Sequence, residues 1–272
     1  MAPPLILTQK EVDVLYDLLE ILAAALSSLD VPFIPIAGSL LGAVRSRSIL
    51  FNDDDVDVAI FITDYAKVRA ELPALLQRHG ASFSTKGAPF CDKIRSRSCS
   101  HVWIDLFVLQ EYRNPEDVLA VISLKDNGQR QSDEYVSAVT RHLPPLEEFP
   151  IFHYHTRKGI ELWPKEYFTR SELFPIAPSS VQFGHLRLAS PHSFTSHLFR
   201  AFGPRCLTHY PHPRSSSAHL YVREFAQRVA ALLPLPEGAG EEEEDGLTPL
   251  TPDQLLPVLH SRHKNHPSSE ES

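Results

Sequence analysis

Apolar residues recur at helical spacing near the N-terminus and form strand-like runs further along the chain. Thr8 and Glu11 have the spacing of a capping box, and the apolar positions that follow predict a helix to about Leu29. Similar patterns predict, in chain order, a strand over 31–36, a turn at Gly38 and Ser39, a short helix over 40–44, a strand over 56–62, a helix from about 63 to 80, strands near 91–94 and 102–109, a short helix over 164–170, a strand pair over 181–188 and a helix over 191–202.

This order of elements predicts a mixed α+β fold, with a small mixed sheet flanked by helices. Residues 111–150 are polar and contain prolines, and no element is assigned to them. We expect one compact domain over residues 1–210, a size that can bury a substantial core. Pro, Ser, His and Glu dominate a C-terminal extension over 211–272, in which we expect a helix at 218–233 and a largely disordered tail.

Composition excludes some classes of protein and leaves others open. The formal net charge of −8 argues against a nonspecific nucleic-acid binder, which needs a basic surface to neutralise phosphates. The three cysteines have neither a disulfide framework nor zinc-site spacing. No run has the length of a membrane span, and the N-terminus lacks the order of a secretory signal, so the expected location is cytoplasmic by default. The oligomeric state is not readable from the sequence.

An acidic run carries the strongest chemical signal in the chain. Asp55 and Asp57 are two residues apart in an apolar run, so a strand would point both carboxylates to the same face. Mg²⁺ prefers such hard oxygen ligands and leaves positions open for substrate phosphates. A turn at Gly38 and Ser39 would add backbone amides and a hydroxyl for a phosphate oxygen. The alternative is a solvated acidic loop, but Asp57 lies within the apolar run, where an unpaired carboxylate is costly.

A third carboxylate interrupts another strand-like run, since Asp105 has apolar neighbours on both sides. Beside Asp55 and Asp57 it would complete a cluster that binds one or two metal ions, or it would accept a proton from a hydroxyl. The alternative is a strand acid that faces water. Lys93 and Arg95 alternate along a strand and share a face that suits substrate phosphates.

These residues resemble the defining motif of the LicD and fukutin-related phosphotransferases, a branch of the nucleotidyltransferase superfamily. The resemblance is carried by the segment GSLLGAVRSRSILFNDDDVDVAI at 38–60 and by later matches, in order: Lys93-Ile94-Arg95, the run at 103–107, the run at 173–176, Phe183-Gly184, Ser190-Pro191 and Phe202-Gly203. The chain departs from the family at Asn52, where an aromatic is usual, and at His192, where Asn or Asp is usual. These departures leave the carboxylates intact and bear on substrate identity.

The resemblance implies a metal-dependent phosphotransferase that moves a phospho-alcohol group, such as phosphocholine or phosphoribitol, from a CDP-linked donor to a glycan hydroxyl and releases CMP. Mg²⁺ or Mn²⁺ would neutralise the phosphoryl charge. The expected roles are, in full: metal ligands Asp55, Asp57 and Asp105; proton acceptor Asp105 or Asp53; donor-phosphate binding by Gly38 and Ser39; and fixed positive charge from Arg45, Lys93 and Arg95.

Two other functions are compatible with the sequence. The chain could transfer a nucleotidyl group from an NTP with release of pyrophosphate. It could also be an inactive relative that acts as a binding partner of an active enzyme, with Asn52 and His192 as signs of drift. The three retained carboxylates argue against the second alternative.

Overall fold

We analysed a computed structural model of the 272-residue chain. It describes residues 7–50, 53–85, 90–125, 127–211 and 247–249. The expected helix at 218–233 lies outside the described residues, as does the rest of the C-terminal extension apart from residues 211 and 247–249.

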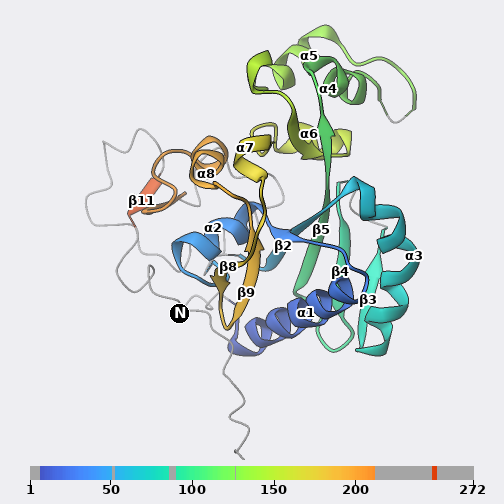
Figure 1. Ribbon diagram of the computed structural model, residues 1–272, viewed down its shortest axis with the longest axis vertical. Coiled ribbons are helices and arrows are strands. Elements are labelled where there is room, and N and C mark those ends of the chain that lie inside the picture. The colour runs from blue at the N-terminus through green and yellow to red at the C-terminus, as the bar shows by residue number, and fades with distance from the viewer. Residues whose placement is uncertain (1–6, 51–52, 86–89, 126, 212–246, 250–272) are drawn as a thin grey trace, which may run out of the picture.

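The centre of the molecule is a seven-stranded mixed sheet (Figure 1). Its strands are β1 (Ile34–Pro35), β2 (Asp55–Phe61), β3 (Ala81–Ser84), β4 (Asp92–Ser96), β5 (Trp103–Tyr112), β6 (Ile151–Tyr154) and β7 (Phe168–Thr169). They pair in the order β1-β2-β5-β4-β3, and the far half of β5 also pairs with β6, which pairs with β7. Only β2 and β5 run parallel in this sheet. Two antiparallel pairs lie outside it: β8 (Ala177–Phe183) with β9 (Leu186–Ser190), and β10 (His209–Pro211) with β11 (Leu247–Pro249).

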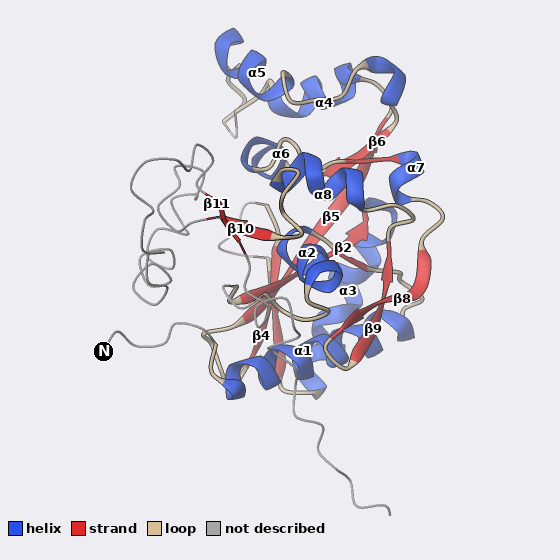
Figure 2. Ribbon diagram, turned by 90° about the vertical axis from the view of Figure 1, so that its left-hand side faces the viewer, coloured by secondary structure: helices blue, strands red, loops and turns tan. Residues whose placement is uncertain are grey.

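The helices of the described residues pack on both faces of the sheet and beyond one end of it (Figure 2). They are α1 (Gln9–Ser28), α2 (Ala37–Arg45), α3 (Ile62–Arg78), α4 (Pro115–Ile122), α5 (Asp133–Thr140), α6 (Arg157–Leu162), α7 (Arg170–Leu173) and α8 (Thr195–Phe202), with a 3₁₀ turn at Leu146–Glu148. Helix α1 begins with the expected capping box, because Thr8 and Glu11 bond each other's backbone N–H.

Alternation along β2 divides the side chains between two cores. Val56, Val58 and Ile60 face the core that α1 and α3 cover. Ala59 faces the second core, which α2, β6 and α8 cover. Because successive strand residues point to opposite faces, Asp55 and Asp57 lie on the second side as well. A third, smaller core forms around Tyr112 under α4, α5 and α6.

The prediction of a mixed α+β fold with a helix-flanked sheet is confirmed, and several local predictions are wrong. The predicted strand over 31–36 is reduced to Ile34–Pro35. Gly38 and Ser39 lie in the first turn of α2 and not in a separate tight turn, because the helix begins at Ala37. The predicted helix over 164–170 is also wrong. That segment is a turn leading into β7, and α7 begins only at Arg170.

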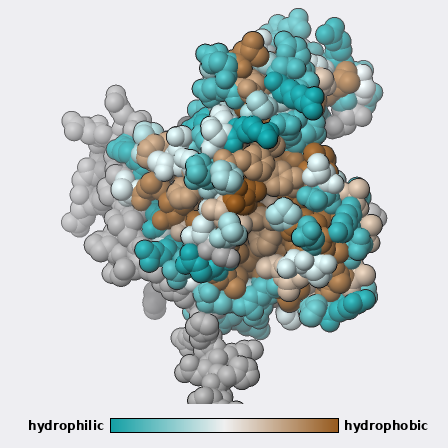
Figure 3. All heavy atoms as spheres, viewed as in Figure 1, coloured by the Kyte–Doolittle hydropathy of each residue, from teal (hydrophilic) through white to brown (hydrophobic). Residues whose placement is uncertain are grey.

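The described surface is mixed in character. In Figure 3 the end formed by α4 and α5 is mainly hydrophilic, and hydrophobic residues gather in the middle of the face shown. Among the described helices, none combines the length and apolar character needed to cross a bilayer.

Candidate active site

Three carboxylates gather where the chain enters β2. Asp53, Asp55 and Asp57 each offer a carboxylate oxygen, and these oxygens lie within 4.8 Å of one another. In the described part of the chain, no other group of three or more His, Cys, Asp or Glu side chains is arranged so that it could hold a metal ion. We call these three residues the carboxylate cluster.

The start of α2 holds the cluster in place. The backbone N–H of Ile36 donates to the carbonyl of Asp57 (3.1 Å), and the Asp57 N–H donates to the buried hydroxyl oxygen of Ser39 (2.8 Å). A Cβ atom on Gly38 would lie 2.5 Å from Oδ2 of Asp53. Glycine is therefore required for the helix to approach the carboxylates this closely. Positive potential at the helix N-terminus favours negative charge there.

The electrostatics of the cluster suit a hard cation. Burial raises the pKa of Asp53 to about 6. Burial, followed by repulsion from the neighbouring carboxylates, raises the pKa of Asp55 and of Asp57 well above the usual value. Negative charge concentrated on carboxylate oxygens is what Mg²⁺ and similar ions bind. The cluster can therefore bind a metal ion.

Asp105 lies next to the cluster but is not one of its three members. It is the register partner of Asp57 on the parallel strand β5, so both side chains point to the same face. Its Oδ1 accepts from Nζ of Lys93 at 2.6 Å, and the Asp105 residue is 5% exposed. Asp105 is near enough to raise the pKa of each cluster carboxyl. The structure thus brings Asp55, Asp57 and Asp105 to one face, and Asp53 is the third member of the tight group.

The expected basic residues occupy different positions. Lys93 lies between Asp105 and the ring of Trp103, with Nζ 4.5 Å from the ring centroid. The Arg95 guanidinium lies 5.6 Å from the same centroid. Arg45, at the end of α2, donates to the carbonyl of Cys206 (3.1 Å), and burial lowers its pKa to about 10. The nearby negative charge of Asp53 raises the pKa of Arg45 and so partly offsets the effect of burial.

Sequence reasoning missed a buried acid near the cluster. Glu166 is 7% exposed, and Oε2 accepts from the hydroxyl of buried Tyr154 at 2.6 Å. Burial raises the pKa of Glu166 to about 7, and its charge contributes to the raised pKa of Asp57. The Tyr154 ring packs 4.8 Å from that of Phe107, two residues beyond Asp105 on the same face of β5. No local sequence pattern indicates this contact, because Glu166 lies in an irregular turn.

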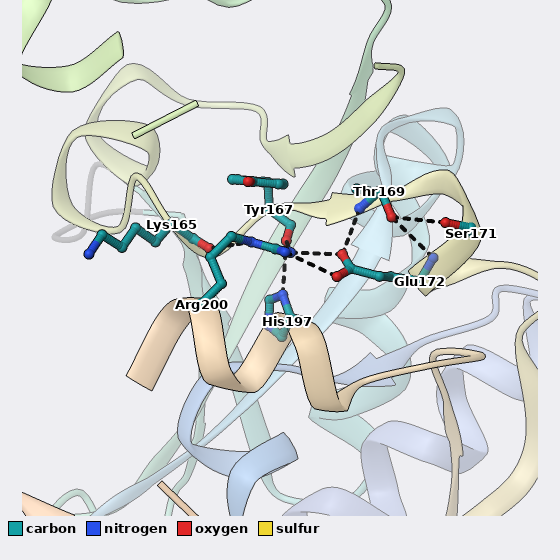
Figure 4. A network of polar contacts seen from close by, with 7 residues as sticks. All are labelled: Lys165, Tyr167, Thr169, Ser171, Glu172, His197 and Arg200. Carbon is teal, nitrogen blue, oxygen red and sulfur yellow. Dashed lines mark hydrogen bonds and ion pairs between the residues drawn. The ribbon is translucent and has the colours of Figure 1, made fainter. Parts of the chain in front are cut away.

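A second network of polar contacts connects α8 to α7 and to the segment around β7 (Figure 4). Arg200 donates to both carboxylate oxygens of Glu172 (3.0 and 2.7 Å) and to the carbonyl of Tyr167 (2.6 Å). The carbonyl of Tyr167 also bonds the ring of His197 (2.9 Å). The sequence contains a local pattern for part of this network, because Thr169 and Glu172 have the spacing of a capping box and form one at the start of α7. The network is structural, because its partners are one another and backbone carbonyls.

Solved structures with partial likeness to the chain are nucleotide-handling proteins. ANT(2'')-Ia in complex with adenylyl-2''-tobramycin shares 17% identity with a TM-score of 0.25, covering 34% of this chain and 47% of the other. Terminal uridylyl transferase 4 from Trypanosoma brucei with bound GTP shares 14% identity with a TM-score of 0.25, covering 52% and 38%. The chain thus spans half or less of the length of these proteins. No curated protein matches the chain.

A family match covers the part of the chain that carries the cluster. Residues 30–156 match the family described as LicD/FKTN/FKRP, nucleotidyltransferase domain. This span contains α2, β2, β4 and β5, and with them Asp53, Asp55, Asp57 and Asp105. Over residues 30–156 the chain therefore matches the LicD/FKTN/FKRP family of nucleotidyltransferase domains.

Proposed function

We propose that this protein is a metal-dependent phosphotransferase that moves a phospho-alcohol group from a CDP-linked donor to a glycan hydroxyl and releases CMP. The alcohol we expect is of the choline or ribitol kind. The observation that carries the proposal is the carboxylate cluster, whose oxygens converge within 4.8 Å inside the family domain.

The residues of the cluster fit a divalent cation, with Mg²⁺ or Mn²⁺ as the expected ion. Asp53, Asp55 and Asp57 would hold it, and their pKa values are raised first by burial and then by repulsion from neighbouring carboxylates, both of which a bound cation would offset. When bound, such an ion supplies charge stabilisation to the phosphates of the donor. The first turn of α2, with Gly38 and Ser39, faces the same place and would orient the phosphates through its positive end.

Asp105 is then the candidate to accept the proton of the attacking hydroxyl. Asp53 is needed in the cluster, which leaves Asp105 as the neighbouring carboxylate outside it. Lys93 holds one oxygen of Asp105 and fixes the orientation of the carboxylate. A positioned base of this kind contributes about 10²–10⁴-fold to a rate.

We further propose that the functional domain extends past the family match, to about residue 210. The charge of Glu166 contributes to the raised pKa of Asp57, and the carbonyl of Cys206 accepts a hydrogen bond from Arg45. Leu198 of α8 belongs to the same core as Ala59 and Phe107. Removal of residues 157–210 would therefore expose the core that supports the cluster.

The test is a transfer assay with the full chain. CDP-choline and CDP-ribitol are each incubated with glycan acceptors and Mg²⁺ or Mn²⁺, and CMP release and acceptor modification are measured. We expect release that requires the ion and is lost in Asp57→Asn. The matched control is Asp17→Asn, because Asp17 is an exposed acid on α1. Pyrophosphate release from labelled CTP, without CMP release from CDP-alcohols, would overturn the proposal in favour of nucleotidyl transfer.

A further inference from the structure

The register of β2, β5 and β4 places charged and aromatic side chains in two rungs on the site face of the sheet. Each rung runs from an aspartate of β2, through a residue of β5, to a basic residue of β4. The rungs are Asp55, Trp103 and Arg95, and Asp57, Asp105 and Lys93. Register partners share a face, so all six side chains belong to the same surface.

In the second rung, Lys93 and Asp105 form an ion pair with each other. Nζ of Lys93 lies 2.6 Å from Oδ1 of Asp105, and the two side chains are only 15% and 7% exposed. A close ion pair in this partly dehydrated position uses the positive charge of Lys93 to compensate Asp105. Lys93 is thus already committed to Asp105, although the sequence alone places it with Arg95 as a phosphate ligand.

The first rung has an aromatic residue where the second has an acid. Trp103 lies between Asp55 and Arg95, and the guanidinium is 5.6 Å from the ring centroid. Among the described residues Arg95 forms no ion pair with a carboxylate. The indole nitrogen of Trp103 is buried and finds no acceptor there either, so packing and not a hydrogen bond holds the ring. A cation–π contact at this distance leaves the N–H donors of Arg95 available to another group, and the same ring also lies 4.5 Å from Nζ of Lys93.

The geometry points to Arg95 as the cation that binds the diphosphate of the ligand, and to Trp103 as the residue that positions it. Arg95 is two strands away from Asp55, which corresponds to about 10 Å between backbones. A long arginine side chain can span part of that distance and form paired bonds to a phosphate. Trp103 also separates the guanidinium from the carboxylate cluster, so that the two charges do not neutralise each other. The choice of a diphosphate ligand rests on the proposed function.

The experiment uses the full chain, Mg²⁺ and inorganic pyrophosphate as the probe. The chain has two tryptophans, so Trp163→Phe leaves Trp103 as the single indole fluorophore. We expect pyrophosphate to change the Trp103 emission, because it engages the Arg95 guanidinium, which lies 5.6 Å from the ring centroid. In calorimetry, Arg95→Gln should bind pyrophosphate about tenfold to hundredfold more weakly, as expected for one charge-assisted contact. Arg97→Gln, which removes the same charge from an exposed residue just after β4, should change the affinity less than threefold.

Trp103 is tested by a pair of variants. Trp103→Phe keeps an aromatic face under Arg95 and should retain most of the affinity, whereas Trp103→Leu should lose about threefold to tenfold. Thermal unfolding confirms that each variant is folded. Equal effects of Arg95→Gln and Arg97→Gln, or equal affinities of the Phe and Leu variants, would overturn the inference.

This binding test is independent of turnover. A chain that binds pyrophosphate in this way but transfers nothing from CDP-alcohols would refute the proposed function and leave the inference intact. A chain that releases CMP normally with Arg95→Gln, at an unchanged KM for the donor, would refute the inference and leave the function intact.

Discussion

Replacing Gly38 by alanine separates the role of the carboxylate cluster from the stability of the fold. The added Cβ would lie 2.5 Å from Oδ2 of Asp53, whereas ordinary contact begins at 3.4 Å. The carboxylate must therefore retreat by about 1 Å, which is enough to remove it from a ligand position. Asp53 is the end of a flexible side chain, so the fold can accommodate this movement at little cost.

The magnitudes follow from this geometry. Gly38 lies in α2, and alanine is favoured over glycine in a helix by up to about 1 kcal/mol, so the melting temperature should stay within about 3 °C. Mn²⁺ affinity should fall about tenfold to hundredfold, and turnover about 100-fold. Calorimetric titration with Mn²⁺ and thermal unfolding in EDTA measure the two effects separately.

Gly42 supplies the matched control in the same helix. A Cβ there would collide with the backbone carbonyl of Ser48, which cannot move aside as a side chain can. Gly42→Ala should therefore destabilise the chain by about 2–3 kcal/mol and leave the Mn²⁺ affinity of the folded protein unchanged. Native Mn²⁺ affinity in Gly38→Ala would refute the assignment of Asp53 to the cluster.

Three further predictions concern charge. Asp57→Asn should lower turnover by several orders of magnitude, while the melting temperature in metal-free buffer holds or rises, because a repulsion among closely spaced, partly buried carboxylates is relieved. In EDTA the native chain should lose stability relative to Asp53→Asn as the pH rises from 5 to 7, because a carboxyl with a folded-state pKa raised to about 6 stabilises the fold only while protonated. Comparison with Asp53→Asn cancels the opposite pH dependence of His153 and His197, two buried histidines with lowered pKa values. A difference in stability between the two chains that stays constant from pH 5 to 7 would contradict the prediction. Glu172→Gln should cost about 2–3 kcal/mol in urea unfolding, because the guanidinium of Arg200 loses its paired carboxylate, and Mn²⁺ affinity should not change.

The features that the sequence predicted well depend on local periodicity. The two-residue spacing of Asp55 and Asp57 fixes their common face once β2 forms, and the capping box fixes the start of α1. The strand containing Asp105 was predictable from its apolar run. Each of these predictions needs only a few consecutive residues.

The features that it missed depend on contacts between distant segments. The ion pair of Lys93 with Asp105 follows from the register of β4 against β5, which no local pattern determines. Asp53 joins the cluster because α2 approaches it at Gly38. The helix expected over 164–170 does not form, because Phe168 and Thr169 pair with β6 as the short strand β7. Pro164 had favoured a helix start, but this local preference does not determine the structure of the segment.

The central claim is that Asp53, Asp55 and Asp57 together hold a divalent cation, with Asp105 beside it. Calorimetric titration of Mn²⁺ into the full chain and into single Asp→Asn variants at these positions tests it most directly. We expect binding at one site that is lost or weakened at least about tenfold by the changes at Asp53, Asp55 and Asp57 and is largely kept in Asp105→Asn. Binding that survives Asp57→Asn, or that depends on Asp105 and not on Asp53, would contradict the account.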